Sequence, residues 1–328
     1  MARARGSGRR FGGAGEGTLP DLRVTARLVD EFAAGDALAV AAKLRELRKA
    51  SGVQGLEQCN LPLADRKLKP ADLMQAMFSR NSEAPIPILA ASTPSDCFWI
   101  AFEACRIALK YMLPVIVLTD GYLANGAEPW RIPSVNEIPQ IPVRFETNPE
   151  GFKPYKRNPE TLARPWAIPG TPGLEHRIGG IEKQDITGNV SYDPENHHRM
   201  TLLRAGKVAG IANSIPDLEG YGAQEGDLLI VGWGSTYGAL RSAVERLRAE
   251  GQAVGHAHVR YLNPFPKNTG EVLSRFRKVL VPELNLGQLR MLLRATYLVD
   301  AEGYNMVRGK PFRIAEIHER AEQILAGR

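Results

Sequence analysis

Residues 70–141 read PADLMQAMFSRNSEAPIPILAASTPSDCFWIAFEACRIALKYMLPVIVLTDGYLANGAEPWRIPSVNEIPQI. Apolar residues at helical spacing from Leu73 predict a short helix, and the apolar run 86–91 predicts a strand. Residues 97–111 repeat apolar side chains at i, i+3, i+4 and i+7, which predicts a second helix. Residues 115–118 are continuously apolar, as expected of a parallel strand buried on both faces. Because helices and strands alternate, this stretch predicts an α/β fold.

Polar residues follow the second of these strands, at the edge where open α/β sheets place ligands and subunit contacts. The dipeptides Asp120-Gly121 and Asn125-Gly126 also favour turns, so turn chemistry explains them equally well. Two residues of the segment SRNSEAP lie in the loop before the first strand, and a solvated loop is their alternative explanation. The candidate contact residues in this part of the chain are Arg80, Asn81, Asp120, Tyr122, Asn125 and Gly126.

The rest of the chain divides into a loop-rich stretch and a second α/β region. Residues 128–200 are dense in Pro, Gly, Asn and His, which predicts an ordered connector with little regular structure. From residue 226 strands and helices alternate again, as in a small parallel α/β domain. We predict strands at 227–231, 254–259, 279–282 and 314–317, and helices at 236–249, 272–276, 287–299 and the C-terminal end.

The segment GWGSTYG at residues 232–238 follows a strand and opens a helix. Its pattern is GxGxxxG rather than the dinucleotide-binding GxGxxG, and the next strand ends in His258 and Arg260 instead of an acidic residue. The glycines therefore favour a tight strand-to-helix turn, although an anion such as a phosphate at this helix N-terminus is an open alternative. The candidate residues here are Gly232, Gly234, Ser235 and Thr236.

Composition excludes several classes of protein. The net charge of +6 over 328 residues comes without an aromatic-interleaved basic stripe, which argues against nucleic acid. No apolar run reaches the length of a membrane span, and we expect a cytoplasmic protein. Cys97 and Cys105 are predicted on the apolar face of a helix, and the three cysteines lack CxxC spacing. Adjacent histidines in a Pro/Asn loop make a poor ligand set, so no metal site is predicted.

Four long strings resemble one enzyme family, the alpha subunits of 2-oxoacid:ferredoxin oxidoreductases, and are most like the 2-oxoglutarate enzyme. They are the opening run, GLEHRIGGIEKQDITGNVSYDPENHHRM at 173–200, GDLLIVGWGSTYGALRSAVERL at 226–247, and HVRYLNPFPKN with VLVPELNLGQLRMLL within 258–293. The resemblance covers roughly residues 70–320.

The resemblance implies oxidative decarboxylation of a 2-oxoacid, with thiamine diphosphate as electron sink, coenzyme A as acyl acceptor and ferredoxin as electron acceptor. It implies that a partner beta subunit holds the diphosphate, Mg²⁺ and an iron–sulfur cluster, so that this chain binds none of them alone. The candidate residues would then line a substrate or coenzyme A channel or a subunit interface.

The N-terminal region departs from the family pattern. Alpha subunits of this family have YPITPS, SGPG and RGGPSTG strings and an activating glutamate before the segment that begins here at Ala71, but no such string occurs in residues 1–70. No residue can therefore be assigned as the activating glutamate or the substrate-binding arginine. We expect residues 1–69 to be largely disordered or frame-altered, through a frameshift or a truncated gene. A lineage-specific N-terminus is the alternative.

The predicted architecture has four parts, and the predicted function follows the resemblance. An atypical N-terminus, 1–69, precedes the rear part of a pyrimidine-type thiamine diphosphate domain at 70–145, a connector at 146–225, and a transketolase-C-like three-layer α/β domain at 226–328. We predict that the chain is the alpha subunit of a 2-oxoacid:ferredoxin oxidoreductase and that it is inactive without its partner. The alternatives are a non-catalytic docking fragment or decayed gene product, and an NAD(P)-dependent dehydrogenase.

Overall fold

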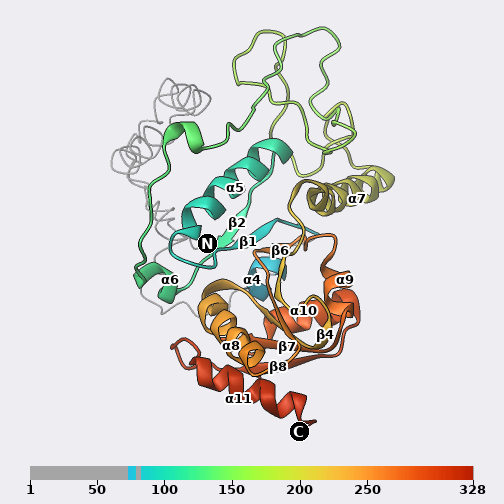
Figure 1. Ribbon diagram of the computed structural model, residues 1–328. Helices are drawn as coiled ribbons and strands as arrows, with labels where there is room; N and C mark the ends of the chain where they lie inside the picture. The colour runs from blue at the N-terminus through green and yellow to red at the C-terminus, as the bar shows by residue number, and fades with distance from the viewer. Residues whose placement is uncertain (1–72, 79–82, 328) are drawn as a thin grey trace, which may run out of the picture. The chain divides into compact units, whose positions relative to one another are not determined.

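The computed structural model describes residues 73–78 and 83–327 (Figure 1). The helices are α4 (Leu73–Phe78), α5 (Asp96–Tyr111), α6 (Gly121–Asn125), α7 (Pro194–Gly210), α8 (Tyr237–Ala249), α9 (Thr269–Ser274), α10 (Gln288–Tyr297) and α11 (Ile314–Leu325). The strands are β1 (Ile88–Ala90), β2 (Ile116–Leu118), β3 (Gly220–Gly222), β4 (Gly226–Gly232), β5 (Val254–His258), β6 (Tyr261–Asn263), β7 (Phe276–Glu283) and β8 (Ala301–Asn305).

Residues 133–141 fall in a different compact unit from the other described residues. Their described structure is a single 3-10 turn, Val135–Glu137. The turn is capped by its own last residue, because the Ser134 amide donates to Glu137 Oε2 at 2.7 Å. All elements discussed below lie in the other unit.

The C-terminal region forms a five-stranded sheet in the order β3-β5-β4-β7-β8. All neighbouring strands are parallel except β3, which runs antiparallel to β5. Helices α8 and α11 cover one face through one buried apolar cluster, and α9 and α10 cover the other face through a second cluster. Since β5 lies on one side of β4 and β7 on the other, the strand order reverses at β4, where α/β sheets bind ligands.

A second sheet of three strands, β2-β1-β6, joins the front of the chain to the rear. β1 and β2 are parallel, whereas β6 pairs antiparallel with β1 and comes directly after β5 in the sequence. Helix α5 packs on this sheet through Ile100, Ile107 and Tyr111. The second sheet is therefore completed by a strand from the C-terminal region.

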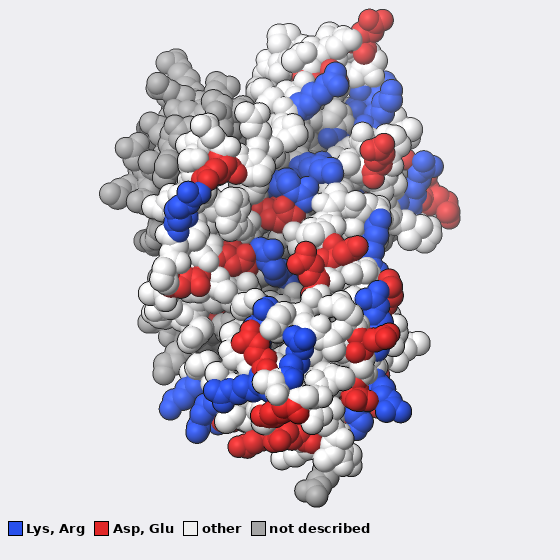
Figure 2. Space-filling view, viewed as in Figure 1, with Lys and Arg blue, Asp and Glu red and all other residues white. Residues whose placement is uncertain are grey.

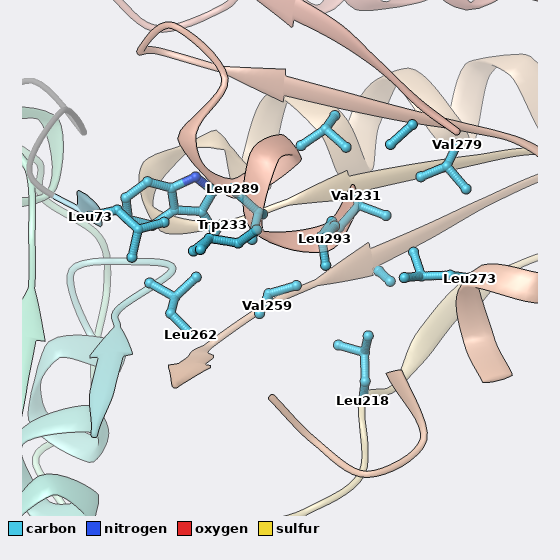
Figure 3. Close-up of a cluster of buried hydrophobic side chains, with 14 of the residues drawn as sticks. Leu73, Leu218, Val231, Trp233, Val259, Leu262, Leu273, Val279, Leu289 and Leu293 are labelled. Atoms are coloured by element: carbon cyan, nitrogen blue, oxygen red, sulfur yellow. The ribbon is translucent and has the colours of Figure 1, made fainter. Parts of the chain in front are cut away.

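One apolar cluster runs through both sheets. Figure 3 shows Leu73 of α4 beside Trp233 and Leu289, with Leu262 of β6 nearby. Leu73 and Leu289 are fully buried, and Trp233 is 4 % exposed. The short helix predicted from Leu73 is thus confirmed, and its buried side holds it against α10.

One secondary-structure prediction for the C-terminal half is wrong, and several elements there, including β3, β6, β8 and α7, were not predicted. The segment predicted as a strand at 314–317 starts helix α11, whose Ile317, Ala321 and Ile324 recur at helical spacing and are buried. Strand β8 was not predicted because its sequence AEGYN has little strand propensity; its register with β7 holds it at the sheet edge. Helix α7 lies within the predicted loop-rich connector, where Asp193 caps it and Pro194 begins it.

Two predictions about burial also need correction. β2 is half-buried throughout rather than buried on both faces, because it lies at the edge of the described sheet. Cys97 is half-buried against the cluster under α5, but Cys105 is exposed. Cys105 lies five residues after the buried Ile100, about 140° around the helix, and so faces away from the sheet. No helix in the described ranges is long and apolar enough to cross a membrane.

Leu240→Ala tests the α8 side of the five-stranded sheet. Leu240 is fully buried, so its truncation leaves a cavity and is expected to lower the free energy of unfolding by about 2–5 kcal/mol. Urea unfolding measures the change. Leu286→Ala is the matched control, because Leu286 is 78 % exposed and its truncation removes little packing. Equal losses in both variants would contradict the packing described here.

Candidate functional site

Asp120 joins the end of the three-stranded sheet to the five-stranded sheet. Its carboxylate follows β2 and caps α6, with Oδ1 accepting from the amides of Tyr122 at 3.0 Å and Leu123 at 3.1 Å. The other oxygen, Oδ2, accepts from the Ser235 amide at 3.2 Å, in the turn after β4. Asp120 is 7 % exposed. One buried carboxylate therefore holds two segments that lie 115 residues apart in the sequence.

Two glycines of the turn after β4 are needed for different reasons, Gly232 for lack of space and Gly234 for its backbone conformation. A Cβ at Gly232 would lie 2.3 Å from Leu240 Cδ1, and Gly234 has a φ of +60°, which favours glycine. Thr236 closes the turn by donating its hydroxyl to the Trp233 carbonyl at 2.8 Å. The prediction that these glycines allow a tight strand-to-helix turn is confirmed.

Two histidines of β5 lie against this turn. His258 Nε2 donates to the Gly234 carbonyl at 3.1 Å, and His256 Nδ1 donates to the Ile230 carbonyl at 2.9 Å. The Tyr237 ring packs on both, with centroid distances of 5.1 Å to His258 and 6.0 Å to His256. Burial lowers the pKa of His256 to about 4 and also lowers the pKa of His258 well below its ordinary value. Both rings are therefore neutral at pH 7.

A bidentate ion pair lies between α5 and the end of β5. Arg260 donates to both carboxylate oxygens of Asp96, through Nε to Oδ2 at 3.1 Å and through a terminal nitrogen to Oδ1. The same Oδ2 accepts from the Ser92 amide at 2.9 Å and the Ser92 hydroxyl at 2.8 Å. We call the region formed by Asp96, Asp120, Ser235, His258 and Arg260 the seam.

Glu283 ends β7 as a fully buried carboxylate. Oε1 accepts from Trp233 Nε1 at 3.1 Å, Asn285 Nδ2 at 3.0 Å and the Leu289 amide at 2.8 Å, and Oε2 accepts from the Arg290 amide at 3.0 Å. These donors include the N-terminal amides of α10, which favour a negative charge. Glu283 therefore fixes α10 and the Trp233 ring to the carboxyl end of the sheet.

The seam leaves no free carboxylate for the activation of thiamine diphosphate, which the resemblance implies for the assembled enzyme. Asp96, Asp120 and Glu283 all accept hydrogen bonds from donors of this chain. These carboxylates therefore do not fit that role. A dinucleotide also fits poorly, because the Ser235 amide at the helix start already donates to Asp120.

Asp120 and the turn after β4 bring together five of the predicted site residues, namely Asp120, Gly232, Gly234, Ser235 and Thr236. Three other predicted site residues, Tyr122, Asn125 and Gly126, belong to α6 or directly follow it. Tyr122 is 55 % exposed, Asn125 donates to the Gly121 carbonyl at 2.7 Å, and Gly126 lies too close to the Tyr122 carbonyl for a Cβ. Arg80 and Asn81 lie outside the described residues.

The Asp96–Arg260 pair was not predicted as part of the site. Its partners are 164 residues apart, and a single sequence holds no signal that joins them. The position of Arg260 at the end of a predicted strand was the available hint.

Two histidines of the loop-rich connector and of α7, His176 and His197, make contacts within the chain. His176 Nδ1 donates to the Leu174 carbonyl at 2.8 Å, and His197 pairs with Glu182. A different group in the described ranges, Glu250, His318 and Glu322, has ligand atoms within 4.8 Å of one another. It lies at the surface, and its atoms already pair with each other.

Two family models and a solved structure match large parts of this chain. Residues 69–192 match "Pyruvate flavodoxin/ferredoxin oxidoreductase, thiamine diP-bdg", and residues 226–316 match "Pyruvate:ferredoxin oxidoreductase core domain II". The 2-oxoglutarate:ferredoxin oxidoreductase from Magnetococcus marinus, solved with 2-oxoglutarate, coenzyme A and succinyl-CoA bound, aligns with a TM-score of 0.74 and 30% identity. The alignment covers 78% of this chain and 45% of that chain.

The matches place the chain among the subunits of 2-oxoacid oxidoreductases with a thiamine diphosphate-binding domain. It is 52% identical over 263 residues to 2-oxoglutarate oxidoreductase subunit KorA of Mycobacterium tuberculosis, and 32% identical over 227 residues to a 2-oxoacid:ferredoxin oxidoreductase subunit alpha of Aeropyrum pernix. These alignments cover 80% and 66% of this chain, but only 40% and 35% of the relatives. The chain belongs to the family of alpha subunits of 2-oxoglutarate and other 2-oxoacid:ferredoxin oxidoreductases.

Asp120→Asn tests the role of the bridging carboxylate. The amide keeps one acceptor for the α6 cap, but its NH₂ group cannot accept from the Ser235 amide, so we expect a loss of about 1–3 kcal/mol in unfolding free energy. Asp193→Asn is the control, because Asp193 caps α7 with one oxygen and asparagine caps helices equally well. Similar stability of both variants in urea unfolding would contradict the bridge.

The buried His256 ring predicts a loss of stability in acid. The unfolded chain takes up a proton near pH 6.5 but the folded chain only near pH 4, so stability falls as pH drops between these values. This ring alone is expected to contribute about 3 kcal/mol. His256→Asn keeps a donor for the Ile230 carbonyl and should show a smaller loss between pH 7 and 4 than the unaltered chain. NMR titration of the ring near pH 6.5 would contradict the prediction.

Proposed function

We propose that this chain serves as the alpha subunit of a 2-oxoglutarate:ferredoxin oxidoreductase. The complex would decarboxylate the 2-oxoacid, pass two electrons to ferredoxin and transfer the acyl group to coenzyme A. The observation that carries the proposal is the 52% identity to a 2-oxoglutarate oxidoreductase subunit across 263 residues. The name of the Magnetococcus enzyme, and the 2-oxoglutarate and coenzyme A bound to it, support the same substrates.

The proposed partner is a beta subunit that holds Mg²⁺, the diphosphate of thiamine diphosphate and an iron–sulfur cluster. Dependence on this partner is supported by the seam, whose carboxylates are occupied by donors of the chain. The cysteines of the described region, Cys97 and Cys105, are far fewer than the roughly four thiolates of a cluster. We place the complex in the cytoplasm, the expectation from the sequence.

We assign α6 to the interface with this partner. The seam would hold α6 in place for that contact. Tyr122 on α6 and the nearby Trp130 expose 55 % and 41 % of their surface, and exposed aromatic residues are typical centres of protein interfaces. Asp120 caps α6 and holds the turn at Gly232, Gly234, Ser235 and Thr236, so the seam fixes the position of this helix.

Mixing the chain with a cluster-bearing beta subunit tests the function. We expect the two proteins to associate, and we expect no 2-oxoglutarate- and coenzyme A-dependent reduction of methyl viologen by the chain alone. Reduction by the chain alone would contradict its dependence on the partner. If the two proteins fail to associate in size-exclusion chromatography, the subunit assignment is wrong. Binding of NAD in calorimetry would favour the dehydrogenase alternative instead.

Tyr122→Ala tests the interface assignment. Removal of an exposed aromatic side chain at the centre of an interface is expected to weaken association with the beta subunit about tenfold, measured by surface plasmon resonance. Tyr192→Ala is the matched control, because Tyr192 is 96 % exposed and lies in the connector. If the Tyr122 variant binds as tightly as the control, α6 does not form this interface.

A further inference from the structure

A basic pocket lies at the end of α5 opposite to the seam. Helix α5 begins at the seam with Asp96 and ends at Tyr111, about 24 Å away. The pocket has a volume of about 240 Å³ and is formed by the residue after α5, the connector and α7. Figure 2 shows Lys and Arg side chains gathered where the end of α5 adjoins the connector. The charged lining residues are Arg157, Arg164, Glu182, Lys183, Arg204 and Lys207.

Two of the five cations in this lining pair with acidic residues, and a third, Lys183, donates to a backbone carbonyl. Arg157 pairs with Asp185 at 2.6 Å, and Lys183 donates to the Gly179 carbonyl. Arg204 lies 3.8 Å from Glu182, the only acidic residue of the lining. Because Glu182 also pairs with His197, its charge is shared, and the pocket remains positive.

The other two cations, Arg164 and Lys207, have no acidic partner among the described residues. Arg164 lies over the Tyr155 ring at 4.5 Å, and Lys207 Nζ donates to the Met112 carbonyl at 3.4 Å. Burial, together with Arg164 and Arg157, lowers the pKa of Lys207 to about 8. The same positive field that disfavours a proton on Lys207 favours an anion beside it.

We propose that this pocket binds a phosphate group, through Lys207 and Arg164. A phosphate offers several acceptor oxygens and up to two negative charges, which match one ammonium and one guanidinium group without acidic partners. A carboxylate supplies a single charge and matches this pair less well. Nothing in this argument depends on the reaction proposed above.

The neighbouring cavity allows the phosphate to belong to a larger ligand. This cavity has a volume of about 570 Å³, and Arg157 and Arg164 line both spaces. A free ion would occupy the smaller pocket alone, whereas a phosphorylated organic molecule would extend past Arg164. Competition between phosphate and a phosphorylated organic molecule distinguishes these two ligands.

Calorimetric titration of the full chain with inorganic phosphate at pH 7 is the first test. Lys207→Met and Arg164→Gln should each weaken binding roughly tenfold, because each removes one charge-assisted contact. Lys310→Gln, at an exposed lysine outside the pocket, should bind phosphate as the unaltered chain does. Thermal unfolding of each variant shows whether it folds. Absence of phosphate binding, or equal binding by all variants, would overturn the proposal.

The pH dependence of sulfate binding gives a second readout, since sulfate stays a dianion from pH 6 to 10. Binding is expected to weaken roughly tenfold between pH 7 and 9 as Lys207 loses its proton near pH 8. The titratable and charged groups that line the pocket with Lys207 are Tyr155, Arg157, Arg164, Glu182, Lys183 and Arg204. Lys207→Arg should retain binding and lose this dependence, because arginine stays charged. A pH dependence that persists in this variant would overturn the assignment to Lys207.

Competition with coenzyme A, a phosphorylated organic molecule, identifies the source of the phosphate. Displacement of phosphate by coenzyme A that is weakened by Lys207→Met would support a pocket for the phosphate of a larger ligand. Phosphate binding without displacement would support a site for the free ion.

Discussion

The pairing of β6 with β1 is the contact on which the rest of the structure depends. β6 follows β5 closely in the sequence, yet it hydrogen-bonds to the other sheet. Three contacts fix it there: the Ala90 amide donates to the Arg260 carbonyl at 2.8 Å, Asn263 donates to the Ile86 carbonyl at 2.6 Å, and Arg260 pairs with Asp96. Because β6 bridges the two sheets, their apolar side chains form one shared cluster, and neither sheet has a complete core without the other.

The seam combines strong hydrogen bonds with neutral rings. Asp120 and Asp96 carry their charges among donors, whereas His256 and His258 are kept uncharged by burial. A second positive charge beside Arg260 would be costly, so neutral imidazoles suit this position. Asp120 caps α6 and also holds the turn after β4, and a displacement of α6 would therefore be transmitted to the five-stranded sheet through a single carboxylate.

Local patterns in the sequence predicted the α/β class and most of the parallel strands, because buried strands and amphipathic helices leave regular apolar repeats. The sequence also indicated Asp120 and the glycine turn after β4, because each follows a strand. Their contact with one another was not predictable, since 115 residues separate them. β8 and α7 were missed for a different reason: neighbouring elements and caps stabilise them rather than their own composition. The start of α11 was predicted as a strand because four residues are too few to distinguish the helical repeat of apolar side chains from the alternation typical of a strand.

The dependence of β1 on β6 has a consequence for the connector between them. Ile178 and Ile181 lie fully or largely exposed in that connector, which makes this turn accessible to a protease. A cut there would separate β1, β2 and α5 from β6 in the chain, but the sheet, the Asp96–Arg260 pair and the shared apolar cluster would still hold the fragments together. A nicked molecule would therefore run as two bands in a denaturing gel while it migrates as a single folded species in solution.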